Sequence, residues 1–179
     1  STISTFFEYA RGGRFNYTYG GDINGDGSNL NDLLYIPTAG EISQMQFSGE
    51  GQADAFNTYI EQDDYLSDRR GQYAERYGAI APWRGKWDLK FLQDYNCKVS
   101  ENKTHTIQFS IDILNVGNLI SSEWGLTQQP NNVQPIGVAV DAETSSPIYT
   151  FDPNLTETFG YDSTLLSRWQ MQFGLRYIF

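Results

Sequence analysis

Apolar and polar residues alternate in four separate segments of the chain, a pattern typical of strands with one apolar and one polar face. In the last segment the odd positions are all apolar: Trp169, Met171, Phe173, Leu175, Tyr177 and Phe179. The same alternation marks three earlier segments, with few interruptions. It predicts strands over 2–11, 84–96, 104–115 and 166–179.

The length of these segments changes the interpretation. The alternation in 169–179 covers eleven residues, whereas strands of soluble domains usually have about five or six. At about 3.3 Å per residue and a tilt near 45°, eleven residues rise about 25 Å, which is the height of the apolar band of an outer-membrane barrel.

The connections between the predicted strands alternate in length. Those over about 12–83 and 116–165 are long, and the one between the two middle strands is short and polar. Long extracellular loops and short periplasmic turns alternate in this way in outer-membrane barrels. Within the first long connection, the apolar spacing predicts helices over 51–62 and 65–77. The pattern thus favours an all-β fold of antiparallel strands.

Charge is distributed unevenly along the chain. The 179 residues carry 22 Asp and Glu against 12 Lys and Arg, a net charge of −10 that argues against a nucleic-acid partner. Residues 15–65 and 116–165 hold 15 of these acids and no Lys or Arg. This distribution fits solvated loops, or an acidic surface that attracts cations.

One acidic segment has the start of a calcium-binding pattern. Asp22, Asn24 and Asp26 offer oxygen ligands at alternate positions, and Gly27 follows at the sixth position. The twelfth position is Leu33, and the nearest carboxylate, Asp32, comes one residue early. Two interpretations stay open, a structural Ca²⁺ site and a turn held by side-chain hydrogen bonds. We expect no other cofactor.

Four aromatic residues lie near the predicted strand ends: Trp83, Trp87, Tyr95 and Trp169. Tyr and Trp favour the headgroup level of a membrane, so these residues are candidates for an aromatic girdle. In a soluble sandwich the same residues would belong to the core. The single His105 and single Cys97 provide no catalytic or metal-binding cluster, and we expect no enzymatic activity.

Several segments resemble a known family. A terminal Phe179 preceded by Phe173, Leu175 and Tyr177 at alternate positions resembles the C-terminal signature that outer-membrane barrels present to their assembly machinery. More narrowly, three segments resemble the C-terminal end of TonB-dependent receptors, in the Oar-like branch common in Bacteroidetes: GGDINGDGSNLNDLLYIP (20–37), APWRGKWDLKFLQDY (81–95) and TIQFSIDILNVGNLISSEWG (106–125).

The resemblance implies a 22-stranded barrel in the Gram-negative outer membrane, with long loops outside and the C-terminus in the periplasm. Such a barrel encloses a plug and imports substrate with energy relayed by TonB. Residues 1–179 would then be the last strands of a longer receptor. Its partners would be the plug and other strands, TonB through the missing N-terminal part, outer-membrane lipids and a surface lipoprotein. The alternative is a secreted all-β module that binds glycans or cell surfaces.

Overall fold

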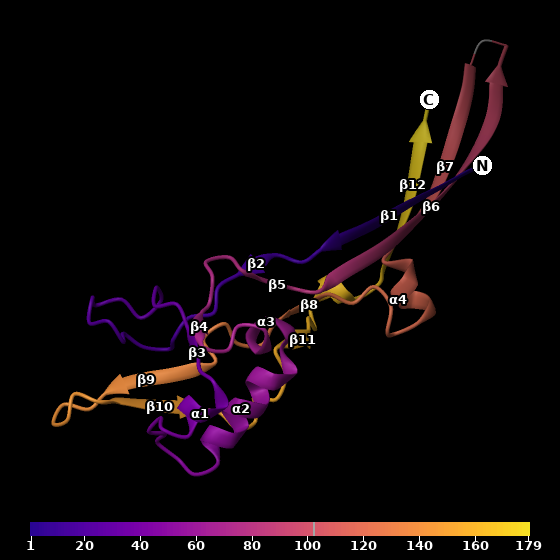
Figure 1. Cartoon of the computed structure of the whole chain (residues 1–179). Coiled ribbons are helices and arrows are strands. Elements are labelled where there is room, and N and C mark those ends of the chain that lie inside the picture. Colours follow the sequence, from indigo (N-terminus) through magenta and orange to yellow (C-terminus); the bar gives the residue numbers. More distant parts are fainter. Residues whose placement is uncertain (102) are drawn as a thin grey trace. The chain divides into compact units, whose positions relative to one another are not determined.

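The structure of the chain is a computed structural model that describes residues 1–101 and 103–179. Strands dominate it, which confirms the expectation of a mainly β fold, and its four longest strands form an antiparallel sheet (Figure 1). The chain divides into two compact units. Unit 1 comprises Ser1–Arg11, Pro82–Gln128 and Tyr161–Phe179, and unit 2 comprises Gly12–Ala81 and Gln129–Gly160.

Unit 1 is built on the four-stranded sheet. Its strands, in spatial order, are β1 (Thr2–Arg11), β6 (Trp83–Ser100), β7 (Lys103–Leu114) and β12 (Gln170–Ile178). Neighbouring strands in this order are antiparallel: β1 pairs with β6, β6 with β7, and β7 with β12. Among the described residues, β1 and β12 each pair on one side only, so both are edge strands.

Two predicted strand boundaries were wrong. β6 continues past residue 96 to Ser100, because Cys97 and Lys98 find partners in β7, opposite His105 and Thr104. The last strand begins at Gln170 instead of 166, because Leu165–Ser167 form a short 3₁₀ helix, η1. The alternation within one segment does not predict which residues of a neighbouring strand it pairs with, or where a short turn replaces the strand.

A tight corner follows β7 in unit 1. Asn115 adopts a left-handed conformation with φ of 55° and precedes helix α4 (Val116–Ile120). Its side-chain amide donates a hydrogen bond to the Gly125 carbonyl at 2.9 Å, and its backbone N–H donates to Asp88 Oδ1 at 2.8 Å. These bonds fix the end of the sheet to the segment that follows it.

Unit 2 consists of short elements from the two long connections. The elements of the first connection are β2 (Arg14–Phe15), β3 (Tyr35–Ile36), α1 (Ala39–Ile42), α2 (Gln52–Gln62), α3 (Asp64–Ser67), β4 (Gln72–Tyr73) and β5 (Ala79–Ile80). The second supplies the hairpin of β9 (Ile136–Val140) and β10 (Pro147–Phe151). Strands β8 (Gln128–Pro130) and β11 (Phe159–Tyr161) pair with each other where the chain passes between the units.

The helix predicted over 51–62 is confirmed as α2, whose apolar residues Phe56, Tyr59 and Ile60 are buried. The helix predicted over 65–77 was wrong beyond Ser67, where α3 ends. The backbone N–H groups of Gly71 and Ala74 bond to the carbonyls of the β3 region instead, at 2.7 Å each. Competing strand pairing therefore overrides the helical spacing.

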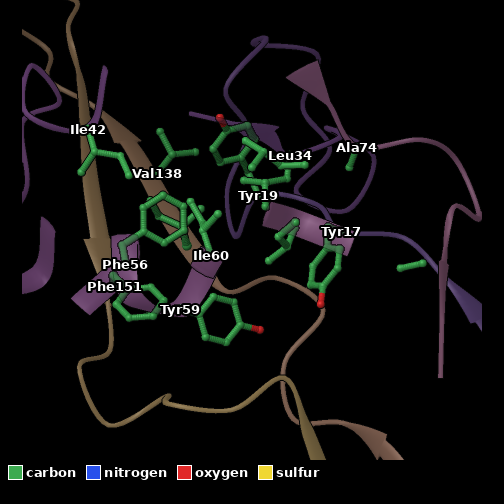
Figure 2. Packing of buried hydrophobic residues seen from close by; sticks show 14 residues of the cluster. Tyr17, Tyr19, Leu34, Ile42, Phe56, Tyr59, Ile60, Ala74, Val138 and Phe151 are labelled. Carbon is green, nitrogen blue, oxygen red and sulfur yellow. The ribbon is translucent and has the colours of Figure 1, made fainter. Parts of the chain in front are cut away.

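Unit 2 holds the hydrophobic core of the described chain (Figure 2). The core cluster draws every one of its buried members from this unit. The aromatic rings of Phe56 and Tyr59 on α2 pack against Phe151 of β10, with centroids 5.3 Å and 5.5 Å apart. The two long connections, predicted as extracellular loops, therefore fold together around one core.

A buried polar network also joins the two segments of unit 2. The Asp63 carboxylate is 6% exposed and accepts hydrogen bonds from Tyr17 Oη at 2.9 Å and Thr158 Oγ1 at 2.6 Å. Its other oxygen caps α3 by accepting from the Leu66 N–H at 2.9 Å. The charge is thus compensated by hydrogen bonds, which a buried carboxylate requires. Burial raises the pKa of the Tyr17 phenol above its usual range.

Candidate functional site: a sheet with one apolar and one polar face

The register of the unit 1 sheet places apolar side chains of all four strands on one face. One row of directly opposed residues runs through Ile3, Phe91, Ile111 and Phe173. Because side chains alternate between faces, every second residue along each strand joins the same surface. The face consists mainly of Phe7 and Tyr9 of β1, Trp87, Leu89 and Tyr95 of β6, Ile107, Phe109 and Ile113 of β7, and Met171, Leu175 and Tyr177 of β12, together with the row above.

The opposite face of the sheet is polar and charged. Lys90 of β6 pairs with Asp112 of β7 at 2.8 Å, and Arg84 pairs with Glu8 of β1 at 3.5 Å. Gln108 donates a hydrogen bond to Asp94 at 2.8 Å. Cross-strand ion pairs and amide bonds therefore organise this face, which also carries apolar exceptions: Phe6, Leu92, Leu114 and Ile178.

The apolar face is exposed over much of its area. Leu175 has 77% of its surface accessible, Ile3 72% and Phe7 66%. Contiguous apolar surface of this kind is rare on soluble monomers and marks contact with a protein or a membrane. This face is therefore the candidate functional surface of unit 1.

The four girdle candidates lie toward the ends of this face. Trp83 begins β6, where its ring stacks on Tyr9 with centroids 5.0 Å apart, and Trp87 follows on the same face. Tyr95 lies further along β6, in one row with Tyr177 of β12. From Trp83 to Tyr95 the strand runs about 40 Å, or about 28 Å of height at a tilt of 45°.

Trp169 immediately precedes β12 and is 44% exposed. None of the four girdle candidates belongs to the buried core cluster of the described residues. The four residues are therefore exposed and not core residues in this structure, and their place in an aromatic girdle stays a prediction.

The four residues of the terminal signature share the apolar side of the last strand. The rings of Phe173 and Phe109 lie 6.4 Å apart, and those of Tyr177 and Phe179 lie 5.8 Å apart. Tyr177 also hydrogen-bonds to His105. Leu175 and Phe179 are largely exposed, at 77% and 91%. The structure thus brings the signature together as one apolar stripe along an edge strand.

The Asp22–Gly27 segment of unit 2 forms a turn held by its own side chains. Asp22 carboxylate oxygens accept from the N–H groups of Gly25 and Gly27, each at 2.7 Å. The Asp32 carboxylate accepts from the Ile23 N–H at 3.0 Å and from the Asn24 amide at 2.5 Å. The side-chain hydrogen bonds that the turn interpretation expects are present, and Asp32 joins the segment although its spacing misses the calcium pattern.

The same carboxylate oxygens are potential cation ligands, so calcium binding stays a prediction. Among residues 1–101 and 103–179, no three His, Cys, Asp or Glu side chains lie close enough together to hold a metal ion. Any Ca²⁺ at Asp22, Asn24 and Asp26 would therefore need amide or backbone oxygens as well. Hydrogen bonding, first from Asn31, lowers the pKa of the Asp26 carboxyl.

Two polar features of the structure were missed by the sequence patterns. The first is the buried Asp63 network, whose partner Thr158 lies 95 positions further along the chain. The second is a pocket on the polar face of the sheet beside η1, lined in part by Lys86, Asp88 and Arg168. Alternation places Lys86 and Asp88 on the polar face, but the folding of 164–168 beside them has no local signal.

In comparisons with known proteins, no family model, curated protein or solved structure matches this chain. Within the described residues, none of the helices combines the length and apolar character needed to cross a membrane.

Proposed function

We propose that this chain is the C-terminal segment of a TonB-dependent outer-membrane receptor and that its four-stranded sheet is part of the barrel wall. One observation carries the proposal: an antiparallel sheet whose apolar face is exposed and spans all four strands. A lipid bilayer would cover that face, and the charged opposite face would line the water-filled interior.

The open edges of the sheet are evidence that further strands complete it. Unpaired N–H and C=O groups are costly in a bilayer, so membrane-spanning sheets must close on themselves. Four strands are too few to close, and β1 and β12 each leave one edge open among the described residues. Further strands of the same receptor, to a total of 22, would supply the missing pairs.

The aromatic ends of the sheet agree with the dimensions of a membrane. Trp83 and Tyr95 lie about 28 Å apart in height at a tilt of 45°, close to the height of an apolar band of about 25 Å. The exposed stripe that ends at Phe179 would serve barrel assembly, with the C-terminus in the periplasm.

In this proposal the two long connections are extracellular. Unit 2 carries 15 of the 22 acidic residues and would form an acidic vestibule through which substrate reaches the barrel. The chain provides wall and vestibule for energy-coupled uptake and performs no covalent chemistry. The plug, TonB and a surface lipoprotein would act through other parts of the receptor.

Adjacent residues on opposite faces of β1 provide the test. Ile3 lies in the middle row of the apolar face, and Ser4 lies on the polar face. A lysine facing the middle of a bilayer costs about 2–4 kcal/mol. Ile3→Lys should therefore lower the partition of the chain into phosphatidylcholine vesicles about 30-fold or more. Ser4→Lys should leave it unchanged, with partition measured by vesicle flotation.

Equal partition of Ile3→Lys and Ser4→Lys would contradict the orientation of the faces. A wild-type chain that stays out of vesicles and unfolds cooperatively as a monomer in plain buffer would contradict the membrane assignment itself. That second result would favour the secreted binding module, whose stability should then rise on addition of a glycan.

A further inference from the structure

A pocket of about 350 Å³ opens on the polar face of the unit 1 sheet. The proposed function rests on the opposite, apolar face, so the pocket is a separate feature. Its floor is formed by β6 and by the ends of β7 and β12, where Leu114 lies opposite Gln170. Its wall is the 164–168 segment that contains η1. Small-molecule sites start at about this size.

The wall of the pocket is anchored from behind. The Thr127 N–H donates to Ser167 Oγ at 2.9 Å, and the Thr127 carbonyl accepts from the Asp162 N–H at 2.8 Å. Asp162 in turn caps the turn by accepting from the Thr164 N–H at 2.7 Å. The wall is therefore held in place without a ligand, which lowers the cost of binding one.

Within the described part of the chain, the two cations of the pocket, Lys86 and Arg168, lack the ion-pair partners that other cations on the same face have. Arg84 and Lys90 of β6 both have carboxylate partners, Glu8 and Asp112. Lys86 lies between them in the strand and faces Glu8, whose carboxylate is engaged by Arg84. In residues 1–101 and 103–179, neither Lys86 nor Arg168 has a carboxylate within 4.0 Å.

The other charges around the pocket limit its net charge. Asp88 lines it, with Oδ1 engaged by the Asn115 N–H at 2.8 Å. Asp162 is not part of the lining, but hydrogen bonding from Thr164 and, to a smaller extent, the charge of Lys86 lower the pKa of its carboxyl. The pocket lining itself, with Lys86, Arg168 and Asp88, has a net charge of about +1 at neutral pH.

The rest of the lining is apolar, with Leu114, Leu165 and Leu166. An occupant must therefore combine one negative charge with a hydrocarbon body. A guanidinium and an ammonium group together suit a carboxylate, which accepts charge-assisted hydrogen bonds from both. We propose that this pocket binds a small monocarboxylate through Lys86 and Arg168, with its hydrocarbon part against the leucines.

This inference does not depend on the membrane assignment, because the pocket lies within unit 1 and on the polar face in either case. Failure of the vesicle experiment would leave it standing, and failure of the binding experiment would leave the membrane proposal standing. Under the proposed function, the pocket would give the interior of the barrel a carboxylate-binding site.

The test measures binding of 4-methylpentanoate to the full chain by saturation-transfer NMR. Acetate supplies the charge alone, 4-methylpentan-1-ol supplies the hydrocarbon alone, and inorganic phosphate supplies another anion. We expect saturable binding of 4-methylpentanoate that is tighter than that of the three other probes. Lys86→Met and Arg168→Met should each weaken it about tenfold or more, since each removes a charge-assisted hydrogen bond.

Lys98→Met is the matched control, because Lys98 is on the same face of β6 outside the pocket, and it should leave binding unchanged. Leu166→Asn should reduce the preference for 4-methylpentanoate over acetate; Leu166 is 52% exposed, so the fold should tolerate the change. The proposal is overturned by absent binding, by binding that Lys86→Met and Arg168→Met leave intact, or by phosphate or the alcohol binding as tightly.

Discussion

Phe56 in unit 2 and Phe173 in unit 1 are the same residue type in opposite surroundings. Phe56 is fully buried in the core cluster, whereas Phe173 has 64% of its surface exposed on the sheet. The difference extends to whole units, since unit 2 holds the core and the sheet of unit 1 presents its apolar residues outward. Unit 2 thus buries its apolar side chains in a core, whereas unit 1 leaves an apolar face that the described residues do not cover.

Charge separates the two units in the same way. Unit 2 contains 15 Asp and Glu against four Lys and Arg, while unit 1 contains seven against eight. Unit 2 therefore has a net charge of −11 and unit 1 of +1, which together give the −10 of the chain. Under the proposed function, the highly charged unit 2 would lie in water, and the apolar face of the nearly neutral sheet would lie against lipid.

The largest expected difference in stability is between alanine substitutions of the buried and the exposed phenylalanine. Phe56→Ala should lower the free energy of unfolding of unit 2 by about 3–5 kcal/mol, because it leaves a cavity among Phe151 and its neighbours. In aqueous buffer, Phe173→Ala should change the stability of unit 1 by less than about 0.5 kcal/mol. Urea titration followed by residue-specific NMR signals measures both, and a similar loss in the two variants would contradict the contrast.

The Asp63 network gives the next largest effect. Asp63→Ala leaves the hydroxyls of Tyr17 and Thr158 without their acceptor and uncaps α3, so unit 2 should lose about 2–4 kcal/mol. Asp64→Ala is the control, since this neighbouring acid is exposed and should cost less than about 1 kcal/mol. Equal losses in urea titrations would show that burial of Asp63 contributes nothing.

Alkaline pH should affect the two units differently. Burial raises the pKa of the Tyr17 and Tyr19 phenols above the usual value near 10. A raised folded pKa means that stability is fully present below pH 10 and falls above it, because only the unfolded chain ionises. At pH 11 the loss should be about 1.4 kcal/mol for each tyrosine.

The measurement for this prediction is the free energy of unfolding of unit 2 between pH 8 and pH 11. Tyr19→Phe should make the decline shallower, because one buried phenol is removed. Tyr73→Phe alters a tyrosine of the same unit that is 65% exposed and should keep the original slope. A decline of the same slope in all three proteins would contradict the role of burial.

Calcium should have the smallest effect, again confined to unit 2. If the Asp22 segment binds Ca²⁺ with a Kd of about 1 mM, 10 mM Ca²⁺ adds about 1.4 kcal/mol of stability at most. Asp22→Asn should abolish the resulting rise in Tm, whereas Asp141→Asn, in another acidic turn of unit 2, should not. Mg²⁺ at the same concentration is the control for ionic strength, and an equal rise with Mg²⁺ would exclude a specific site.

Local periodicity predicts the parts of this fold that depend on one strand or helix at a time. The segment 2–11 became β1 and 51–62 became α2, because each pattern reflects one buried or apolar face. The core of unit 2 escaped prediction, since Tyr17 and Phe151 come from distant segments and share no spacing rule. For the same reason, alternation predicts that Lys86 lies on the polar face of the sheet. It does not predict that no carboxylate of the described residues lies within 4.0 Å of Lys86.

The hydrogen bond between Gln62 and Thr158, which spans 96 positions, has a consequence for the order of folding. The β6–β7 hairpin is local and can form within microseconds. Unit 2 closes only after residues 129–160 reach residues 12–81, and the sheet of unit 1 gains β12 later still along the chain. Ordering so long an intervening segment is entropically costly and slows folding. During synthesis, the core residues of 12–81 therefore lack their partners from the later segment, such as Phe151, until residues 129–160 have emerged.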